Sequence, residues 1–202
     1  MKSILVIGMG RFGRHLAHKM QELGNDIMVI DKEASIIEQI ASDFTDAHVG
    51  DCTNQVVLKA LGVSNFDICF VTIGEDFQAS LVITSLLKTF NAKYIVAKAQ
   101  QDIQADLLRQ IGADEIVYPE REIAEKLAIR HNAKNIFDFI ELTSEYAIYE
   151  IPILPQWING TISSLNIRNK YKINIIAVKN ENTLKPMPGV DYVFKENDHV
   201  VV

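Results

Sequence analysis

The first 31 residues constrain the fold more strongly than any other part of the chain. An apolar, largely β-branched run at residues 3–7 leads straight into the sequence GMGRFG at residues 8–13. Apolar side chains then recur every three or four positions as far as Gly24, and a second apolar run ends at Asp31. This order of strand, glycine turn, helix, strand and acid predicts the opening of a parallel sheet with a helical crossover.

The three glycines and the acid have distinct physical roles. Gly8 allows a tight turn out of the strand, Gly10 lets a pyrophosphate approach the backbone, and Gly13 lets the helix pack close to the sheet. The N-terminus of that helix offers unpaired N–H groups and a partial positive charge to phosphates. Asp31 can accept hydrogen bonds from a ribose 2′-OH and would repel a 2′-phosphate. The pattern predicts an adenosine-nucleotide site; the alternative is a glycine-rich turn in an α/β domain whose site has decayed.

Composition excludes several classes of protein. With 202 residues, 48% of them apolar, the chain can form one large domain, or an ordinary domain and a small one. The net charge of −6 argues against a general nucleic-acid surface. No apolar run reaches the roughly 18 residues of a membrane span, and Lys2 is followed by a strand rather than by a signal peptide. We therefore expect a cytoplasmic protein.

The cysteines and histidines indicate neither a disulfide framework nor a metal site. Cys52 and Cys69 fit a reducing compartment. Cys69 lies within an apolar run and is predicted to be a core residue, whereas Cys52 follows Asp51 in a predicted ligand loop with no base evident nearby. The five histidines show no convincing metal-binding spacing.

The alternation of strands and helices continues after Asp31. Helical patterns at residues 34–42, 56–61, 77–90 and 103–111 separate apolar runs at 47–49, 68–71, 94–97 and 116–118. Six strands alternating with five helices predict an α/β domain with a Rossmann-like, doubly wound parallel sheet. Ligands of such sheets bind outside the carboxyl ends of the strands.

The residues at those strand ends are the candidates for ligand binding, and each has a structural alternative. Asp51 either accepts from an adenine amino group or a ribose, or stabilises a turn. Glu75 and Asp76 either contact a ligand or begin a helix, where acids are favoured. Lys98 either faces phosphates or is an ordinary lysine at a strand end.

After Pro119 the pattern changes. Residues 120–132 form a charged helical stretch with a few apolar positions, and a second amphipathic piece contains Ile136, Phe137, Phe139 and Ile140. We expect both to be crossover helices that pack on a neighbouring copy. Residues 145–202 predict a small α+β domain with strands at 147–151, 173–178 and 199–202, a helix near 161–165 and proline-rich loops. About 55 residues are marginal for independent stability, so this part is expected to dimerise.

Taken together, these motifs resemble the RCK domain, the regulator of potassium conductance. The residues that carry the resemblance are the glycine turn with its arginine at position 11, Asp31, Gly50-Asp51, Lys98-Ala99, Ile111-Gly112-Ala113-Asp114 and Pro119-Glu120. The overall match is to the cytosolic regulatory subunits of bacterial Trk/Ktr potassium uptake systems. It implies a nucleotide-binding TrkA-N half at residues 1–118, crossover helices and linker at 119–144, and a TrkA-C ligand and dimerisation domain at 145–202.

The resemblance also implies partners and ligands. Members of the family form homodimers that assemble into an octameric ring beneath a membrane potassium channel subunit, at the inner face of the cell membrane. NAD(H), ATP and ADP are the nucleotides expected, with Mg²⁺ or Ca²⁺ accompanying ATP and cyclic di-AMP in the C-terminal domain. Family members commonly continue past the terminal strand with a glycine turn and a short helix, whereas this sequence stops at Val202.

The resemblance carries particular roles to particular residues. Arg11 is expected to reach the phosphates and Glu120 to hold a divalent cation beside the γ-phosphate; the alternative is that Arg11 pairs with a nearby acid and Glu120 caps its helix. Arg168 is expected to pair with a phosphate of cyclic di-AMP, and Ile167 and Ile175 to flank its adenine; the alternative is that the two isoleucines are core residues. The complete set of expected binding residues is Gly8, Gly10, Arg11, Phe12, Gly13, Asp31, Lys32, Asp51, Cys52, Thr53, Ile73, Gly74, Lys98 and Glu120 in the N-terminal half, and Ile167, Arg168, Asn174 and Ile175 in the C-terminal domain.

Three classes of function are compatible with these residues. The first is a non-catalytic regulatory subunit that switches on ATP/ADP or NAD(H) binding. The second is a small NAD-dependent oxidoreductase, which would need a substrate domain and a proton donor beside the nicotinamide. The third is a free-standing nucleotide or redox sensor. The final section is short and no Tyr-x-x-x-Lys or His/Asp pairing stands at a strand end, so the regulatory subunit is the prediction.

Overall fold

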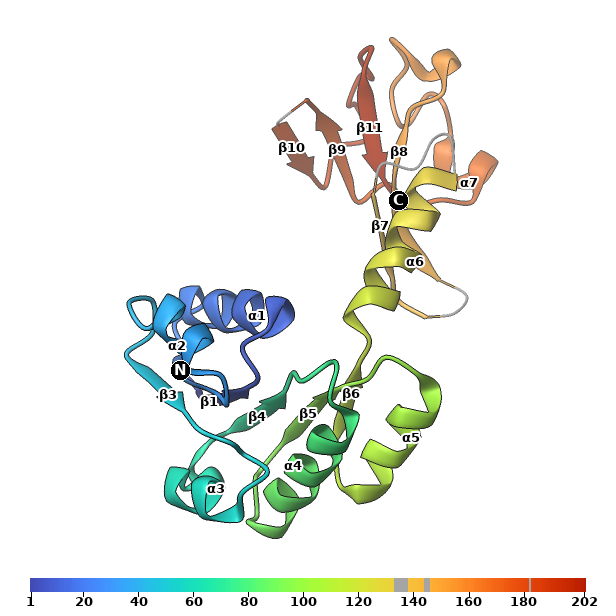
Figure 1. Ribbon diagram of the computed structural model, residues 1–202. Helices are drawn as coiled ribbons and strands as arrows, with labels where there is room; N and C mark the ends of the chain where they lie inside the picture. The colour runs from blue at the N-terminus through green and yellow to red at the C-terminus, as the bar shows by residue number, and fades with distance from the viewer. Residues whose placement is uncertain (133–137, 144–145, 182) are drawn as a thin grey trace. The chain divides into compact units, whose positions relative to one another are not determined.

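The computed structural model describes residues 1–132, 138–143, 146–181 and 183–202, and the chain divides into two compact units, Met1–Glu122 and Ile123–Val202 (Figure 1). The first unit contains a six-stranded parallel sheet with the strand order β3-β2-β1-β4-β5-β6. Its strands are β1 (Ser3–Ile7), β2 (Asp26–Asp31), β3 (Asp46–Val49), β4 (Ile68–Val71), β5 (Ile95–Lys98) and β6 (Glu115–Val117). The order reverses between β1 and β4, and this confirms the predicted doubly wound sheet.

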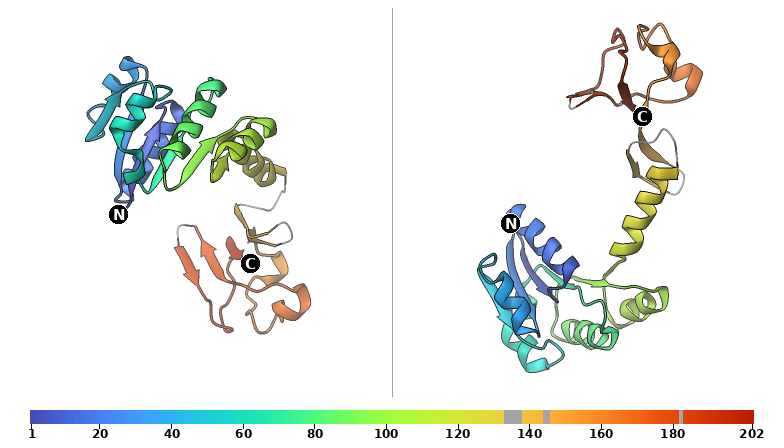
Figure 2. Two further views of the ribbon diagram at one scale, coloured as in Figure 1. Left: turned by 90° about the horizontal axis from the view of Figure 1, so that it is seen from below. Right: turned by 45° about the horizontal axis from the view of Figure 1, so that its top comes forward.

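Helices cover both faces of this sheet (Figure 1 and Figure 2). They are α1 (Arg11–Glu22), α2 (Ala34–Ile40), α3 (Gln55–Leu61), α4 (Phe77–Thr89) and α5 (Asp102–Ile111). Alternate side chains of β1 enter two separate cores: Ile4 and Val6 pack with α1 and α2, whereas Leu5 and Ile7 pack with α3, α4 and α5. This burial on both faces explains why the predicted strands are continuous apolar runs rather than alternating ones.

Local signals set the helix ends of the first unit. Asn54 caps α3 by accepting from the Val56 amide at 3.0 Å, and Asp76 caps α4 by accepting from the Ala79 amide at 2.9 Å. Gly62 adopts the left-handed conformation directly after α3. The observed bounds lie within two residues of the predicted ones throughout this unit. Helix α6 (Pro119–Asn132) begins in the first unit and continues into the second.

The second unit contains a five-stranded antiparallel sheet with the order β10-β9-β11-β8-β7. Its strands are β7 (Asp138–Glu141), β8 (Ala147–Pro152), β9 (Ala177–Asn180), β10 (Thr183–Pro186) and β11 (Asp198–Val201). A short helix, α7 (Ile167–Tyr171), completes the unit. The core is built around Trp157, whose ring centroid lies 5.1 Å from that of Tyr171 and 5.5 Å from that of Phe194. The predicted small α+β domain is therefore confirmed.

Several predicted elements of this unit were wrong in detail. Residues 161–165 form a turn rather than a helix, because Thr161 and Ser164 each accept from the other's amide, at 3.0 and 2.9 Å. The strand predicted at 173–178 begins only at Ala177, since Ile173 and Ile175 pack on the core from a loop. The segment 138–141, predicted as part of a crossover helix, is strand β7, while Ile136 and Phe137 lie outside the described residues.

Candidate functional site

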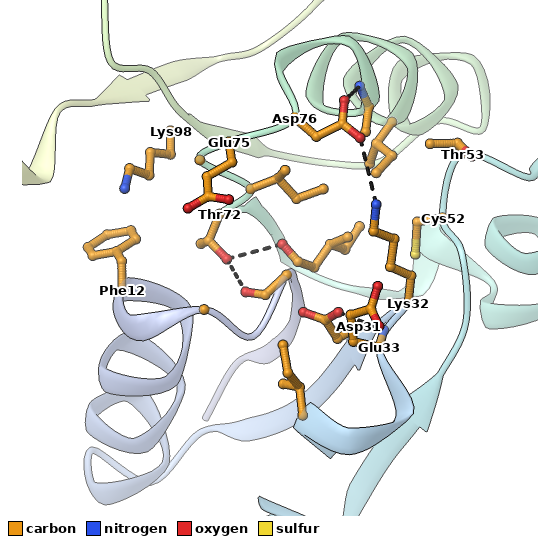
Figure 3. A pocket seen from close by; sticks show the side chains of 18 of the residues that line it. Phe12, Asp31, Lys32, Glu33, Cys52, Thr53, Thr72, Glu75, Asp76 and Lys98 are labelled. Atoms are coloured by element: carbon orange, nitrogen blue, oxygen red, sulfur yellow. Dashed lines mark hydrogen bonds and ion pairs between the residues drawn. The ribbon is translucent and has the colours of Figure 1, made fainter. Parts of the chain in front are cut away.

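A cleft of about 590 Å³ opens at the carboxyl ends of the parallel strands, where the strand order reverses (Figure 3). The glycine turn and the ends of β2, β4 and β5 line it, together with the first turn of α6. Of the residues predicted from the sequence in the N-terminal half, it brings together Gly8, Gly10, Arg11, Phe12, Asp31, Lys32, Asp51, Cys52, Thr53, Ile73, Gly74, Lys98 and Glu120. Gly13 is buried in the first helix turns and does not line the cleft.

The glycine turn has the geometry that a phosphate site requires. Gly8 has a φ of +96°, a conformation that L side chains rarely adopt. A Cβ on Gly13 would lie 2.1 Å from the Gly8 carbonyl oxygen, so only glycine permits this approach of α1 to the turn. A Cβ on Gly10 would meet no atom within 4 Å, and no side chain caps the N-terminus of α1 at this residue. The turn therefore leaves both space and helix N–H groups for a phosphate.

Asp31 fixes the turn as well as facing the cleft. Its Oδ2 accepts from the Met9 amide at 2.6 Å, and its Oδ1 accepts from the Glu33 amide at 2.9 Å. Each carboxylate oxygen has a further lone pair, so both can still accept from a ribose hydroxyl. The carboxylate therefore combines a structural role with the predicted ligand role.

Asp51 and Cys52 form one wall of the cleft. Asp51 Oδ1 accepts from the Thr53 hydroxyl at 2.7 Å and from the Thr53 amide at 2.9 Å, and these bonds lower the pKa of the Asp51 carboxyl. Asp51 therefore stabilises the turn at Thr53, which was the alternative role predicted for it. Burial, followed by the charges of Asp51 and Asp31, raises the pKa of the Cys52 thiol to about 12. A neutral thiol is a poor nucleophile, and the buried Cys52 side chain gives the cleft an apolar wall.

An ion pair crosses the cleft between Lys32 and Asp76. Lys32 Nζ lies 3.7 Å from Asp76 Oδ2, while Asp76 Oδ1 caps α4 (Figure 3). Asp76 therefore caps the start of α4, which was the alternative role predicted for it. Both side chains are about half exposed, so the pair adds little stability. It joins the loop after β2 to the loop after β4 on opposite sides of the cleft.

Lys98 occupies the floor of the cleft beside the glycine turn. Its side chain is 8% exposed, and its Nζ donates to Glu120 Oε1 at 2.6 Å. The ammonium also lies 5.9 Å from the ring centroid of Phe12. The hydrogen bond from Lys98 is the main reason that the pKa of Glu120 is lowered. Arg11 lines the same end of the cleft and is exposed.

Sequence reasoning missed Thr72, which follows directly after β4. Its hydroxyl lies within hydrogen-bond distance of the carbonyl oxygens of Ile7 and Gly8 and so ties the glycine turn to the neighbouring strand (Figure 3). A polar residue immediately after a buried strand was the available signal. Glu33 and Gln100 also line the cleft without having been predicted.

The residues predicted in the C-terminal domain lie in different environments. Ile167 belongs to the hydrophobic core and is 1% exposed, and Ile175 is half-buried against that core. Arg168 and Asn174 are exposed. Within the described ranges, no group of three or more His, Cys, Asp or Glu side chains is arranged to hold a metal ion.

Comparisons with known proteins agree with this architecture. The TrkA-N domain model matches residues 4–119, and the TrkA-C domain model matches residues 146–202. Ktr system potassium uptake protein C of Bacillus subtilis is 37% identical over 201 residues, which span 100% of this chain and 91% of that protein. The chain belongs to the family of TrkA-N and TrkA-C domain proteins that includes the Ktr potassium uptake proteins. Ktr system potassium uptake protein A of the same organism is 32% identical, over 100% of this chain and 90% of the relative. The resemblance predicted from the sequence is thereby confirmed.

Solved structures show the same fold. The GsuK channel aligns with 99% of this chain and 36% of its own, at a TM-score of 0.72 and 21% identity. A GsuK channel bound to NAD gives a TM-score of 0.70, and a GsuK structure bound to ADP gives 0.58 over 64% of this chain. In the part of the chain that the structure describes, no helix is both long and apolar enough to cross a membrane.

Proposed function

We propose that this protein is the nucleotide-binding regulatory subunit of a bacterial potassium uptake channel or transporter. The observation that carries the proposal is the glycine-turn cleft at the reversal of strand order, in a chain whose whole length matches Ktr potassium uptake proteins. The protein acts by binding rather than by catalysis. In support, the Cys52 thiol has a pKa of about 12, Asp31 accepts from backbone amides, and Asp76 and Glu120 pair with lysines.

The cleft fits the adenosine diphosphate portion that NAD(H), ADP and ATP share. The phosphates would lie over Gly10 and the N-terminus of α1, with Lys98 and Arg11 as the nearby cations. The ribose would face Asp31, and its adenine would lie near the Asp51-Thr53 turn. GsuK structures are bound to NAD in one case and to ADP in another, and both ligands contain this portion.

The regulatory role requires assembly with other subunits. Ile123, Leu127 and Ile129 on α6 are 56%, 43% and 39% exposed, and such a surface favours contact with a second copy. We infer a homodimer that assembles into an octameric cytosolic ring beneath a membrane potassium channel subunit. The division into residues 1–118, 119–144 and 145–202 follows the same proposal. Light scattering tests it: a monomer at micromolar concentration, with and without nucleotide, would contradict the assembly.

Two further ligands belong to the proposal. Mg²⁺ or Ca²⁺ would accompany ATP beside Glu120, with the remaining ligands supplied by phosphate oxygens, by water or by a second copy. Cyclic di-AMP would bind the C-terminal domain through Arg168, Asn174 and Ile175. Because Ile167 is in the core, its contribution there would be to support the site.

Calorimetry with purified protein tests the proposed function. We expect ADP, ATP or NADH to bind, and Gly10→Ala to weaken binding strongly because the added methyl group occupies the space meant for phosphate. Gly189→Ala serves as the control, since Gly189 is exposed in the second unit and its Cβ would meet only the exposed carboxylate of Asp191. No measurable binding of any of these nucleotides would refute the proposal.

A further inference from the structure

Lys98 is in an unusual position for a lysine. Its side chain is 92% shielded, at the carboxyl end of β5, and its ammonium lies between the Phe12 ring and the Glu120 carboxylate. The Phe12 ring belongs to the first turn of α1, at the end of the helix where a phosphate would bind, and Figure 3 shows the lysine nitrogen directed toward it. Buried lysines are normally paired with an acid, and the partner of Lys98 is Glu120, which lies in a helix other than α1.

That helix is α6, which runs from the first unit into the second. In its first turn the Glu122 amide donates to the Tyr118 carbonyl oxygen at 2.9 Å, and the Arg121 guanidinium lies 4.1 Å from the centroid of the Tyr118 ring. Three side-chain hydrogen bonds add to these contacts. Glu120 accepts from Lys98 at 2.6 Å, Arg121 Nη1 donates to Asp102 Oδ1 at 2.7 Å, and Glu122 Oε1 accepts from the Tyr118 amide at 3.0 Å. Of these three, only the Lys98–Glu120 contact is made by residues that line the cleft.

We propose that Lys98 is the residue through which a bound phosphate loosens the first turn of α6. The inference rests on the proposed nucleotide site and specifies how that site controls the chain. A phosphate at the N-terminus of α1 competes with Glu120 for the Lys98 ammonium. An ammonium is a compact charge with three donors on a flexible stem, so it can turn from one anion to another without moving the strand.

The loss of this contact removes the hydrogen bond between the first turn of α6 and the cleft, and leaves the contacts of Arg121 and Glu122 in place. Glu120 is 69% exposed, so its carboxylate is stable in water once it is released. A released Glu120 is also available to a divalent cation, and this connects the competition for Lys98 to the cation proposed beside ATP. Phosphate occupancy in the first unit is thereby transmitted to the helix that leads into the second.

The coupling between phosphate binding and the Lys98–Glu120 bond can be measured from ADP affinity alone, because such a coupling acts equally in both directions. If phosphate weakens the Lys98–Glu120 bond, the bond must weaken phosphate binding by the same factor. Removal of the Glu120 carboxylate should therefore tighten ADP binding when no divalent cation is present. The expected factor is about threefold or more, as for partial loss of one charge-assisted hydrogen bond.

The experiment is calorimetric titration of the full chain with ADP in EDTA. We expect Glu120→Gln to bind ADP about threefold more tightly or better, Lys98→Met to bind it more weakly, and the double variant to bind like Lys98→Met. Lys98→Met leaves no buried unpaired charge, because Glu120 is largely exposed. Lys93→Met is the matched control: Lys93 pairs with Asp67 at 2.9 Å, and neither residue lines the cleft.

Amide hydrogen exchange supplies a readout that a purely structural role of Lys98 would not change. ADP should speed exchange at residues 122–125 in the wild type, and Glu120→Gln should show the faster exchange before ADP is added. Two results would overturn the inference while leaving the nucleotide site intact: unchanged or weaker ADP binding by Glu120→Gln in EDTA, or an unchanged exchange rate at these amides when ADP is bound. Absence of ADP, ATP and NADH binding in the wild type would instead refute the proposed function.

Discussion

Gly13→Ala is the substitution whose effect follows most directly from the geometry of the glycine turn. The added Cβ would lie 2.1 Å from the Gly8 carbonyl oxygen and 2.7 Å from Thr72 Oγ1. The first of these atoms is backbone, in a turn that Asp31 holds through the Met9 amide, so it cannot move aside as a flexible side chain would. Helix α1 must then shift away from the sheet, out of the packed core that it shares with Ile4 and Val6.

Two opposing effects set the change in the free energy of unfolding of Gly13→Ala. Overpacking of a well-packed site costs about 1–3 kcal/mol, and a contact with fixed backbone belongs at the upper end. Replacing glycine by alanine within a helix returns about 1 kcal/mol. We therefore expect the first unit of Gly13→Ala to be less stable by about 2 kcal/mol, with ADP binding impaired as well.

Urea unfolding followed by circular dichroism measures the stability, and calorimetry measures the binding. Gly10→Ala is the matched variant, since its Cβ meets no atom within 4 Å and no loss of this size is expected. Gly10→Ala should therefore lose nucleotide binding with little loss of stability, whereas Gly13→Ala should lose both. A Gly13→Ala protein within about 0.5 kcal/mol of the wild type would refute the argument from close approach.

Three further predictions concern individual side chains. Asp31 should make NADPH bind at least about tenfold more weakly than NADH, because its carboxylate repels a 2′-phosphate; equal affinities by calorimetry would contradict this role. Since the pKa of Cys52 is raised to about 12, its thiol stays protonated below that pH, and iodoacetamide should label it in native protein far more slowly than in urea; equally fast labelling in the two conditions would show the thiol to be accessible and reactive. Arg168→Ala should weaken cyclic di-AMP binding measured by calorimetry, with Lys170→Ala, at another exposed cation of α7, as the control; an unchanged affinity would remove Arg168 from the site.

The parallel sheet and the glycine turn were predictable because their signals are local. Each strand of the first unit is buried on both faces and therefore apolar throughout, and Gly8, Gly13 and Asp31 act on residues close to them along the chain or one strand away. The Lys98–Glu120 contact was not predictable in this way. Lys98 lies at the predicted strand end, whereas Glu120 lies in the first turn of α6, so their pairing depends on where α6 leaves the sheet.

The second unit was harder to predict because its local and tertiary signals conflict. Ile173 and Ile175 alternate as in a strand, yet they pack half-buried against the core from a loop that precedes β9. Strand β10 is an exposed edge of four residues ending in Pro186, and its sequence shows little apolar alternation. An edge strand of this kind forms because it pairs with a neighbouring strand, here β9, and the local sequence pattern does not show which strand that is.

Potassium flux in vesicles tests the central claim most directly. A Ktr-type membrane subunit would be reconstituted alone, with the wild-type chain, and with the Gly10→Ala chain, and flux would be measured with ATP, with ADP and without nucleotide. We expect flux with the wild-type chain to depend on which nucleotide is present, and flux with the Gly10→Ala chain to be independent of nucleotide. Flux that is identical in all nucleotide conditions with the wild-type chain bound would contradict a nucleotide-controlled regulatory subunit.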